Sequence, residues 1–132
     1  MKRPLLLGFF FVLVACGGVK KTQEAINVGN YSSAIDKSLE NLAQNKDKKG
    51  NQPYIVLLEE AYRKNMAREL KNIAFLEKDD NPVNYEAIYN TYSSLNEIQE
   101  RIKPLLPLTV VEENRNAKFK FKQGILYLNF EF

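Results

Sequence analysis

Two long stretches of this chain place their apolar residues three or four positions apart, the spacing that puts side chains on one face of an α-helix. The first covers about residues 52–77 and the second about residues 82–102. The stripe of the first is formed by Ile55, Leu58, Tyr62, Met66, Leu70, Ile73 and Leu76. The stripe of the second is formed by Tyr85, Ile88, Tyr89, Tyr92, Leu95, Ile98 and Ile102. The chain is therefore predicted to be mainly α, with two amphipathic helices that bury their stripes.

Asparagine and proline residues mark the ends of these two helices. Asn51 is a suitable N-cap, and Pro53 fits the first helical turn because no amide donor is missed there. The same combination recurs as Asn81 and Pro82. Pro104 is predicted to end the second helix, because proline lacks the amide donor and clashes with the preceding turn.

Two shorter helical segments are expected before the long ones. One begins at Thr22, which is a suitable N-cap, and runs to Val28, while the other covers residues 32–44. Residues 29–30, Gly and Asn, separate the two segments because both residue types tolerate left-handed backbone. Together with the long helices, these segments define a predicted helical domain over residues 22–107.

The sequence around this break has a recognisable pattern. Residues 29–35 read GNYSSAI, and Leu42 supplies an aliphatic side chain farther along the second segment. Residues 84–88, NYEAI, repeat part of the pattern. The pattern resembles the join between the paired helices of a tetratricopeptide repeat (TPR), although the two joins lie farther apart than the usual repeat of about 34 residues. The resemblance implies short TPR-like helical hairpins, which in that family usually present a surface to another protein.

The periodicity changes near the C-terminus, where apolar and basic residues alternate over residues 117–122. Such alternation is typical of a β-strand. If residues 123–124, Gln and Gly, form a two-residue turn, residues 125–132 complete a hairpin with one consistent register. One face then carries Phe119, Phe121, Leu126, Leu128, Phe130 and Phe132. Residues 108–132 are therefore predicted to be a β-hairpin tail, to which residues 109–111 can add a third strand.

The apolar face of this predicted hairpin needs a cover, because two strands alone are marginally stable in water. The helices of the same chain can supply that cover. One alternative is a partner protein that pairs with the chain end. Another is a reading frame that stops short of the parent protein, so that the tail is truncated.

The N-terminal residues have the order of parts found in a secretory signal. Lys2 and Arg3 precede an apolar run over residues 5–15. This run is about half as long as the roughly 20 residues of a membrane-spanning helix, and it has the length of a signal-peptide core. The run ends in Leu-Val-Ala-Cys at residues 13–16. This motif resembles the lipobox of bacterial lipoproteins.

The lipobox resemblance implies that residues 1–15 are a signal peptide, that Cys16 is lipidated, and that residues 16–21 are a lipidated tether. Two or more acyl chains anchor a protein stably, whereas one chain gives marginal binding. Because Gly17 follows the cysteine where an inner-membrane lipoprotein has Asp, the resemblance also implies an outer-membrane position. Residues 17–21 contain no acidic cluster of the kind that some surface-exported lipoproteins carry, which favours the periplasmic face. Two alternatives stay open: an ordinary secretory signal with an incidental cysteine, and a soluble protein with a buried start.

The composition removes several kinds of chemistry. The chain has 132 residues, no histidine, one cysteine and a net charge of +3. One cysteine excludes an internal disulfide and a cysteine-based zinc site, and the small net charge does not indicate nucleic-acid binding. Acidic pairs at residues 59–60, 79–80 and 112–113 are expected to be solvated surface charge. We therefore expect a protein that is not an enzyme and that uses no metal and no cofactor.

Four tyrosines are the first candidate binding residues. Tyr54, Tyr62, Tyr85 and Tyr89 lie on the two long predicted helices. They either line a ligand groove, since tyrosine is enriched in binding surfaces, or fill the core between the helices with their hydroxyls at its rim.

Three lysines are the second candidate set. Lys118, Lys120 and Lys122 alternate with apolar residues and would share one face of the predicted strand. They form either the charged outer face of a strand, which also guards an edge against aggregation, or a basic strip for anionic lipid or cell-wall polymer.

The leading functional hypothesis is a lipid-anchored protein of the cell envelope. Its lipid would contact the membrane, and its helices would be a non-enzymatic scaffold for a protein partner in the envelope. The alternative is an envelope lipoprotein that binds a ligand, or a cell-wall or glycan polymer, through its aromatic face or its lysine strip.

Overall fold

The structure of the protein is a computed structural model that describes residues 17–123. Three features predicted from the sequence lie outside the described residues. These are the signal peptide over residues 1–15, the lipidation site Cys16, and the second strand of the predicted hairpin over residues 125–132.

The described part of the chain consists of four helical segments followed by two short strands. The helical segments are residues 17–27, α2 (Tyr31–Gln44), α3 (Gln52–Lys78) and α4 (Tyr85–Ile102). Short 3-10 turns form at η1 (Lys49–Asn51), η2 (Pro82–Asn84) and η3 (Lys103–Leu105). The strands are β1 (Thr109–Val110) and β2 (Arg115–Asn116), which pair antiparallel. The predicted fold class, mainly α with a small C-terminal hairpin, is confirmed.

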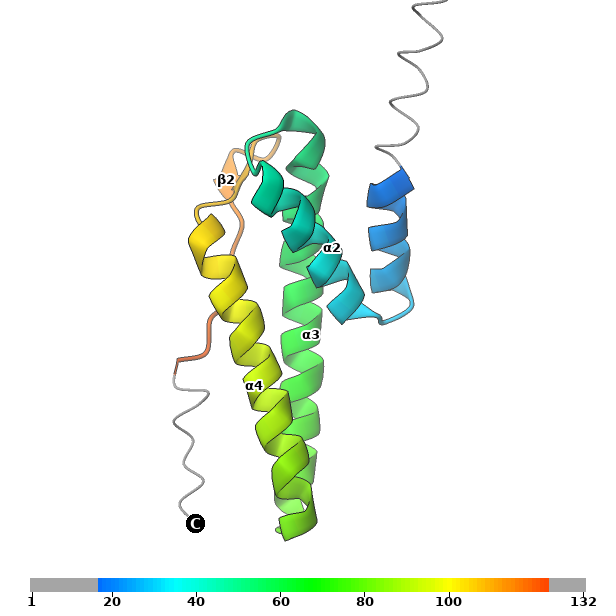
Figure 1. The fold of residues 1–132 in the computed structure, drawn as a ribbon, viewed down its shortest axis with the longest axis vertical. Helices are drawn as coiled ribbons and strands as arrows, with labels where there is room; N and C mark the ends of the chain where they lie inside the picture. Colours follow the sequence, from blue (N-terminus) through cyan, green and yellow to red (C-terminus); the bar gives the residue numbers. More distant parts are fainter. Residues whose placement is uncertain (1–16, 124–132) are drawn as a thin grey trace, which may run out of the picture.

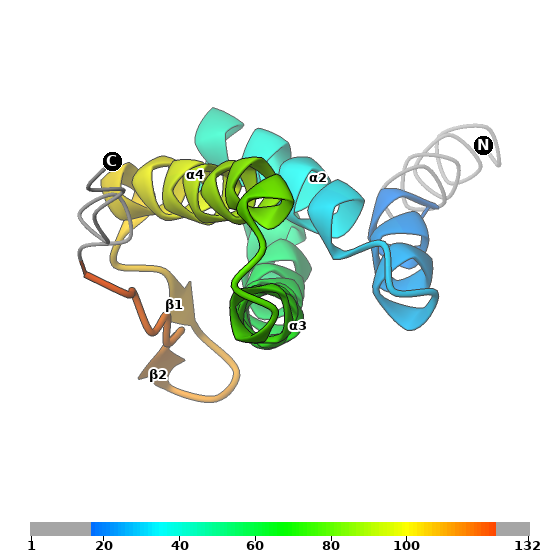
Figure 2. The same ribbon diagram turned by 90° about the horizontal axis from the view of Figure 1, so that it is seen from below.

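Helix α3 is the central element of the fold. It runs along the long axis of the molecule, and α4 returns beside it in the opposite direction (Figure 1). The view along α3 shows α2 and α4 on one side of this helix and the two strands beside it (Figure 2). Among α2, α3 and α4, the more extensive helix interface joins α2 to α3. The helix directions alternate along the chain, as short connections between packed helices require.

The hydrophobic core lies where α2 and α4 meet α3. Its fully buried large side chains include Ile26, Ile35, Leu42, Ile55, Leu58, Ile73, Leu95, Ile102 and Leu108. Both apolar stripes predicted from the sequence supply residues to this core. Leu70 and Leu76 are only partly buried, and Tyr89 is exposed. The stripes therefore predicted the buried faces of the long helices. They failed at Leu70, Leu76 and Tyr89, where no neighbouring element covers the side chain completely.

The first helical segment differs from its prediction at its start. Residues 17–21, expected to belong to the tether, are helical and continue into residues 22–27. The expectation that Thr22 is an N-cap is wrong, because Thr22 is buried inside this helix and its hydroxyl donates to the Gly18 carbonyl at 2.8 Å. A Cβ atom at residue 18 would lie 2.5 Å from Tyr54 Oη, so the helix approaches α3 closely through a glycine.

The turn between this segment and α2 has the predicted chemistry. Gly29 has a φ of +80°, which side chains rarely adopt. The Asn30 side chain caps α2 by accepting a hydrogen bond from Ser33 N. From α3, Arg68 donates to the Gly29 carbonyl at 2.6 Å and stacks over the Tyr31 ring at 4.6 Å. These contacts fix the helical hairpin against α3.

The starts of α3 and α4 also depend on asparagine, in two different ways. The Asn51 side chain makes no cap for α3, so that expectation is wrong. Its amide instead donates to the carbonyls of Asn41 and Asn45, satisfying acceptors at the end of α2. The Asn81 side chain does act as a cap, accepting from Val83 N at the turn η2 that leads into α4. Pro53 lies in the first turn of α3, as predicted.

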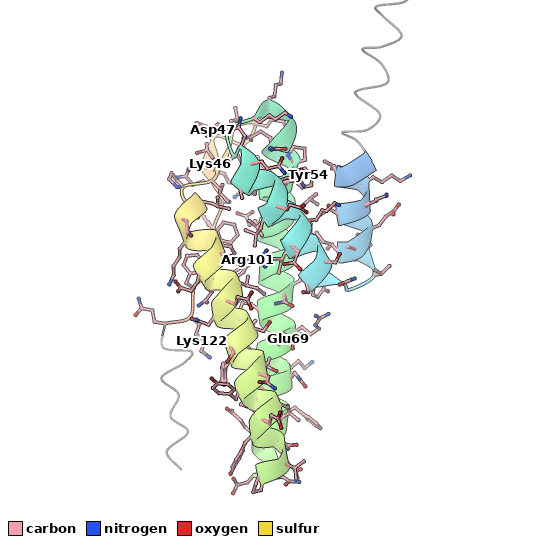
Figure 3. The ribbon with its side chains drawn as sticks, viewed as in Figure 1. Lys46, Asp47, Tyr54, Glu69, Arg101 and Lys122 are labelled. Carbon is pink, nitrogen blue, oxygen red and sulfur yellow. The ribbon has the colours of Figure 1, made fainter. Side chains whose placement is uncertain are left out.

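Polar contacts from the loop after α2 hold the end of α4 in place. Lys46 donates to the carbonyls of Leu105 and Pro107, at 3.0 and 3.3 Å (Figure 3). These oxygens follow the last turn of α4, where carbonyl groups lack helical partners. Nearby, Arg101 on α4 pairs with Asp36 on α2 at 2.6 Å. Both side chains of this pair are exposed, so its contribution to stability is small.

The C-terminal hairpin forms at a different place from the predicted one. Thr109–Val110, considered as an added strand, pairs with Arg115–Asn116. The predicted strand over residues 117–122 is wrong, because these residues join no sheet. Gln52, the first residue of α3, holds β1 by donating to Thr109 O and accepting from Val111 N. The start of α3 therefore holds the hairpin in place.

Candidate functional site

The four candidate tyrosines do not form one surface. Tyr54 and Tyr62 are core residues, with 5% and 3% of their surface exposed. Burial raises the pKa of both hydroxyls, that of Tyr62 to about 12. Tyr85 is partly buried, and Tyr89 is 50% exposed. The structure thus favours the core interpretation for Tyr54 and Tyr62, and it does not bring the four together as a ligand groove.

Tyr62 instead fixes the position of the C-terminal segment. Its hydroxyl donates to the Lys120 carbonyl at 2.9 Å and lies 3.2 Å from Gln99 Oε1. Its ring makes edge-to-face contacts with Phe119 and Phe121, with centroids 5.5 and 6.0 Å away. Such ring pairs add stability beyond that of buried area alone.

Gln99 on α4 completes this attachment. Its side chain accepts from Lys122 N at 2.8 Å and donates to Lys122 O at 3.2 Å. The Gln99 side-chain amide thus satisfies both the N–H and the carbonyl of Lys122, as a neighbouring strand would do in a sheet. Side chains in residues 117–122 therefore alternate between inward and outward positions although the segment joins no sheet. Phe119 and Phe121 turn inward, and the intervening lysines stay exposed.

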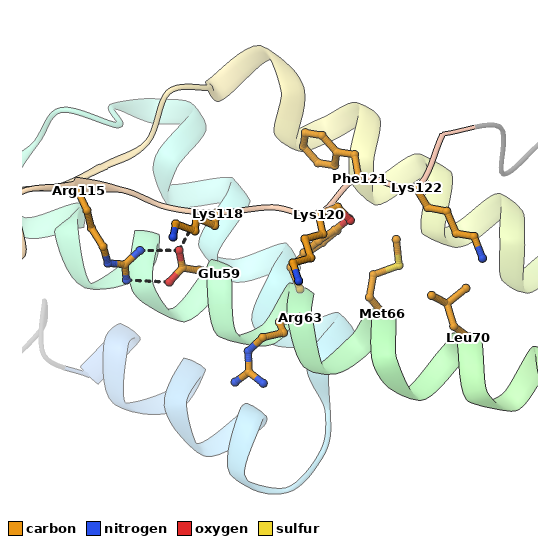
Figure 4. Close-up of a pocket in the computed structure, with 10 residues that line it drawn as sticks. Glu59, Arg63, Met66, Leu70, Arg115, Lys118, Lys120, Phe121 and Lys122 are labelled. Atoms are coloured by element: carbon orange, nitrogen blue, oxygen red, sulfur yellow. Dashed lines mark hydrogen bonds and ion pairs between the residues drawn. The ribbon is translucent and has the colours of Figure 1, made fainter.

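The exposed lysines border a groove beside α3, which we call the lysine groove. It has a volume of about 780 Å³, within the roughly 300–1,000 Å³ of small-molecule sites. It is lined by Glu59, Tyr62, Arg63, Met66, Leu70, Arg115, Lys118, Lys120, Phe121 and Lys122. Figure 4 shows Met66 and Leu70 rising from α3 while Lys122 extends beside them. The groove thus combines an apolar floor with a basic border.

The charges of the groove are unbalanced. Its single carboxylate, Glu59, is held by Arg115 through two hydrogen bonds of 2.8 Å (Figure 4). Four cations remain: Arg63, Lys118, Lys120 and Lys122. Between residues 17 and 123, no carboxylate forms an ion pair with any of these four. The charge of Lys118 does act on the Glu59 carboxylate and helps to lower its pKa. An acidic ligand would therefore meet Arg63, Lys120 and Lys122 as the groove cations that interact with no carboxylate among the described residues.

Glu59 differs from the solvated surface charge that its sequence context predicts. Its carboxylate also accepts from Lys118 N at 2.6 Å, so that expectation is wrong for this residue. The hydrogen bonds from Arg115 lower the Glu59 pKa, burial opposes this, and the Lys118 amide lowers it further. Glu60 does behave as expected, since it lies on the surface and pairs with Lys64 one turn along α3. Glu59 thus links α3 to both β2 and the lysine-bearing segment.

We expect Glu59→Gln to lower the free energy of unfolding by about 1–2 kcal/mol at pH 7, because a charged acceptor of three hydrogen bonds is lost. A carboxyl with a lowered folded-state pKa stabilises the fold above its unfolded pKa, and this contribution disappears as the pH falls through the folded pKa. The difference between the two proteins should therefore shrink below about pH 4. Urea unfolding from pH 7 to pH 3 measures it.

Glu60→Gln is the matched control for this measurement, because the neighbouring surface pair contributes less than about 0.5 kcal/mol. Equal losses for the two variants at pH 7, or a Glu59→Gln loss that does not change with pH, would contradict the assigned role of the Glu59 carboxylate.

The groove presents cationic side chains and hydrogen-bond donors. With a pKa raised to about 12, the Tyr62 hydroxyl stays protonated near neutral pH and does not act as a base. Throughout the described part of the chain, no cluster of three His, Cys, Asp or Glu side chains has the spacing of a metal site. Lysine and arginine provide charge and donors for an acid group.

Several groove residues have other roles in the sequence pattern. Met66 and Leu70 belong to the helical stripe that predicts the core, and no motif marks Arg63 or Arg115 as site residues. A basic residue one position after a stripe tyrosine is weak sequence evidence for a site. The decisive relation, between α3 and a segment more than fifty positions later, exists only in the folded chain.

Comparison with protein-family models, with curated proteins and with solved structures gives no match to this chain. The resemblances to bacterial lipoproteins and to TPR-like helical pairs therefore remain predictions from the sequence. Over residues 17–123, none of the helices is long and apolar enough to span a membrane.

Proposed function

We propose that this protein is a non-enzymatic lipoprotein of a bacterial cell envelope, anchored by acyl chains on Cys16. The support is the order of a short basic start, an apolar run and the Leu-Val-Ala-Cys motif at residues 13–16. The proposed location is the outer membrane, with the folded part facing the periplasm. The support for the outer membrane is Gly17 after the cysteine, and the support for the periplasmic face is the lack of acidic residues over residues 17–21.

We further propose that the folded part binds an acidic molecule of the envelope through the lysine groove. The observation that carries this proposal is the set of four groove cations without an ion pair among the described residues. Charges of one sign around a concave site attract ligands of the opposite sign. The partner is then a membrane component or an acidic polymer that comes within reach of the anchored protein.

Photo-methionine labelling in living cells tests this binding role. The chain has two methionines, Met1 and Met66, and Met66 lies in the groove. Removal of the proposed signal peptide leaves Met66 as the only photo-reactive residue. We expect irradiation to attach an envelope molecule at Met66 in the native sequence.

Two triple variants decide what this adduct means. Changing Lys118, Lys120 and Lys122 to glutamine should remove most of the adduct. The matched change at three exposed lysines outside the groove should preserve it; these are Lys37, Lys71 and Lys78. An adduct that survives the groove variant, or no adduct in the native protein, would contradict the proposal.

The scaffold hypothesis is the second candidate function. Phe75, Val83 and Tyr89 lie at the end of the molecule where α3 turns into α4, and their exposed fractions are 72%, 81% and 50%. Exposed apolar residues that gather in one patch are a feature of protein-binding surfaces, and these three share one end of the helix pair. A protein partner that is lost on Phe75→Ser and kept in the groove lysine variant would favour this candidate.

A further inference from the structure

We propose that the ligand of the lysine groove is a single-chain amphiphile with an anionic head group, such as a monoacyl phosphate or a long-chain carboxylate. This inference rests on the proposed binding role of the groove and specifies its ligand class. The alkyl chain would lie on Met66, Leu70 and Phe121, and the acid group would lie among the lysines.

The floor of the groove has the form that an alkyl chain needs. Tyr62, Met66 and Leu70 follow one another at intervals of four residues on α3, so they lie on one helix face. A row of this length spans about 12 Å along the helix. Tyr62 and Met66 are only 3% and 7% exposed, so Leu70 provides most of the surface that this row offers to an alkyl chain. Phe121 faces the row from the C-terminal segment. Methionine adapts its shape to different apolar partners, which suits a site for a flexible chain.

The border of the groove accounts for an acidic head group. Arg115 is already committed to Glu59 and Glu113. Arg63, Lys118, Lys120 and Lys122 are exposed basic residues at the edge of the apolar floor. A cationic amphiphile would be repelled, and a neutral one would leave the charges without a partner.

An acidic polymer explains these residues less well. A phosphate-rich or uronate-rich chain would engage the lysines, but it offers no apolar surface to Met66 and Leu70. The partly exposed side chains of Leu70 and Phe121 would then stay in contact with water, and the burial of apolar area that drives most association would be lost. The combination of floor and border therefore favours one molecule that carries both parts.

Methyl NMR of Met66 measures this binding directly. The full chain, labelled with 13C at its methionine methyl groups, is reconstituted with its own lipid in phosphatidylcholine nanodiscs. Its two methionines give at most two signals, and Met66→Leu identifies the one from the groove. The probes are octyl phosphate, butyl phosphate, octyltrimethylammonium, inorganic phosphate and hexaglutamate.

We expect octyl phosphate to shift the Met66 signal to saturation, with at least tenfold tighter binding than butyl phosphate, since each buried methylene adds to affinity. Octyltrimethylammonium and inorganic phosphate should leave the signal unchanged. The glutamine variant of Lys118, Lys120 and Lys122 should weaken octyl phosphate binding at least tenfold. The control variant of Lys37, Lys71 and Lys78 should bind as the native protein does.

Other outcomes would overturn the assigned ligand class. Equal binding of octyl and butyl phosphate would show that the apolar floor takes no part. A response to octyltrimethylammonium equal to that for octyl phosphate would show partition without charge selection. Saturable binding of hexaglutamate alone would assign the groove to an acidic polymer or peptide. In this last case the photo-methionine adduct would still form, so the binding role would stand while the amphiphile proposal failed.

Discussion

Tyr62→Ala is expected to lower the free energy of unfolding by about 3–5 kcal/mol, the range for truncating a large buried aromatic residue. The variant loses the edge-to-face contacts with Phe119 and Phe121 and the hydrogen bond to the Lys120 carbonyl. Because small domains are stable by only about 5–15 kcal/mol, the loss should be plain in urea unfolding followed by circular dichroism.

Two companion variants separate the causes of this loss. Tyr62→Phe keeps the ring and removes the hydroxyl, so it should cost about 1–3 kcal/mol, as expected when a buried acceptor is left without its donor. Tyr89→Ala, at an exposed tyrosine on α4, should cost less than about 1 kcal/mol. Equal costs for Tyr62→Ala and Tyr89→Ala would contradict the division of the tyrosines into core and surface.

The second large effect is expected at the proposed anchor. Cys16→Ser should abolish incorporation of labelled palmitate and move the protein from the membrane fraction to the soluble fraction. The reason is that serine has no thiol to carry the acyl group, and stable attachment needs two or more chains. Gel fluorography of cells fed with labelled palmitate gives the first result, and fractionation gives the second.

A matched control for this variant is Gly17→Ala. A Cβ atom at residue 17 meets nothing within 4 Å, and alanine is also small, so labelling and fold should be preserved. Labelling of Cys16→Ser at the native level would contradict the anchor. Loss of labelling in both variants would attribute the effect to general disturbance of the signal rather than to the sulfur.

The long helices were predictable because their folding depends on a pattern within each segment. Apolar residues three and four positions apart define a face, and burial of that face against a neighbour is what stabilises the helix. Gly29 and Asn81 were predictable for a similar reason, since the backbone geometry and capping they provide are local. The N-cap prediction for Thr22 was wrong because threonine is a good cap in isolation, whereas packing against α3 lets the helix begin before Thr22.

The tail and the groove were not predictable in this way. The alternation in residues 117–122 predicts which side chains turn inward. It does not predict which groups form hydrogen bonds with the backbone N–H and carbonyl groups of this segment. In the folded chain, Tyr62 and Gln99 supply those partners, and each belongs to a helix whose local pattern shows no relation to the tail. Glu59 and Arg115 likewise look like ordinary charged surface residues in the sequence. Only their ion pair in the folded chain gives them a structural role.

The measurement that tests the account most directly is the intact mass of the protein purified from the membranes of cells that produce it. The account predicts a chain that begins at Cys16 and carries the added mass of acyl groups on that residue. A chain that still begins at Met1, or one that begins elsewhere with no acyl mass, would contradict the proposed anchor and the envelope role that depends on it.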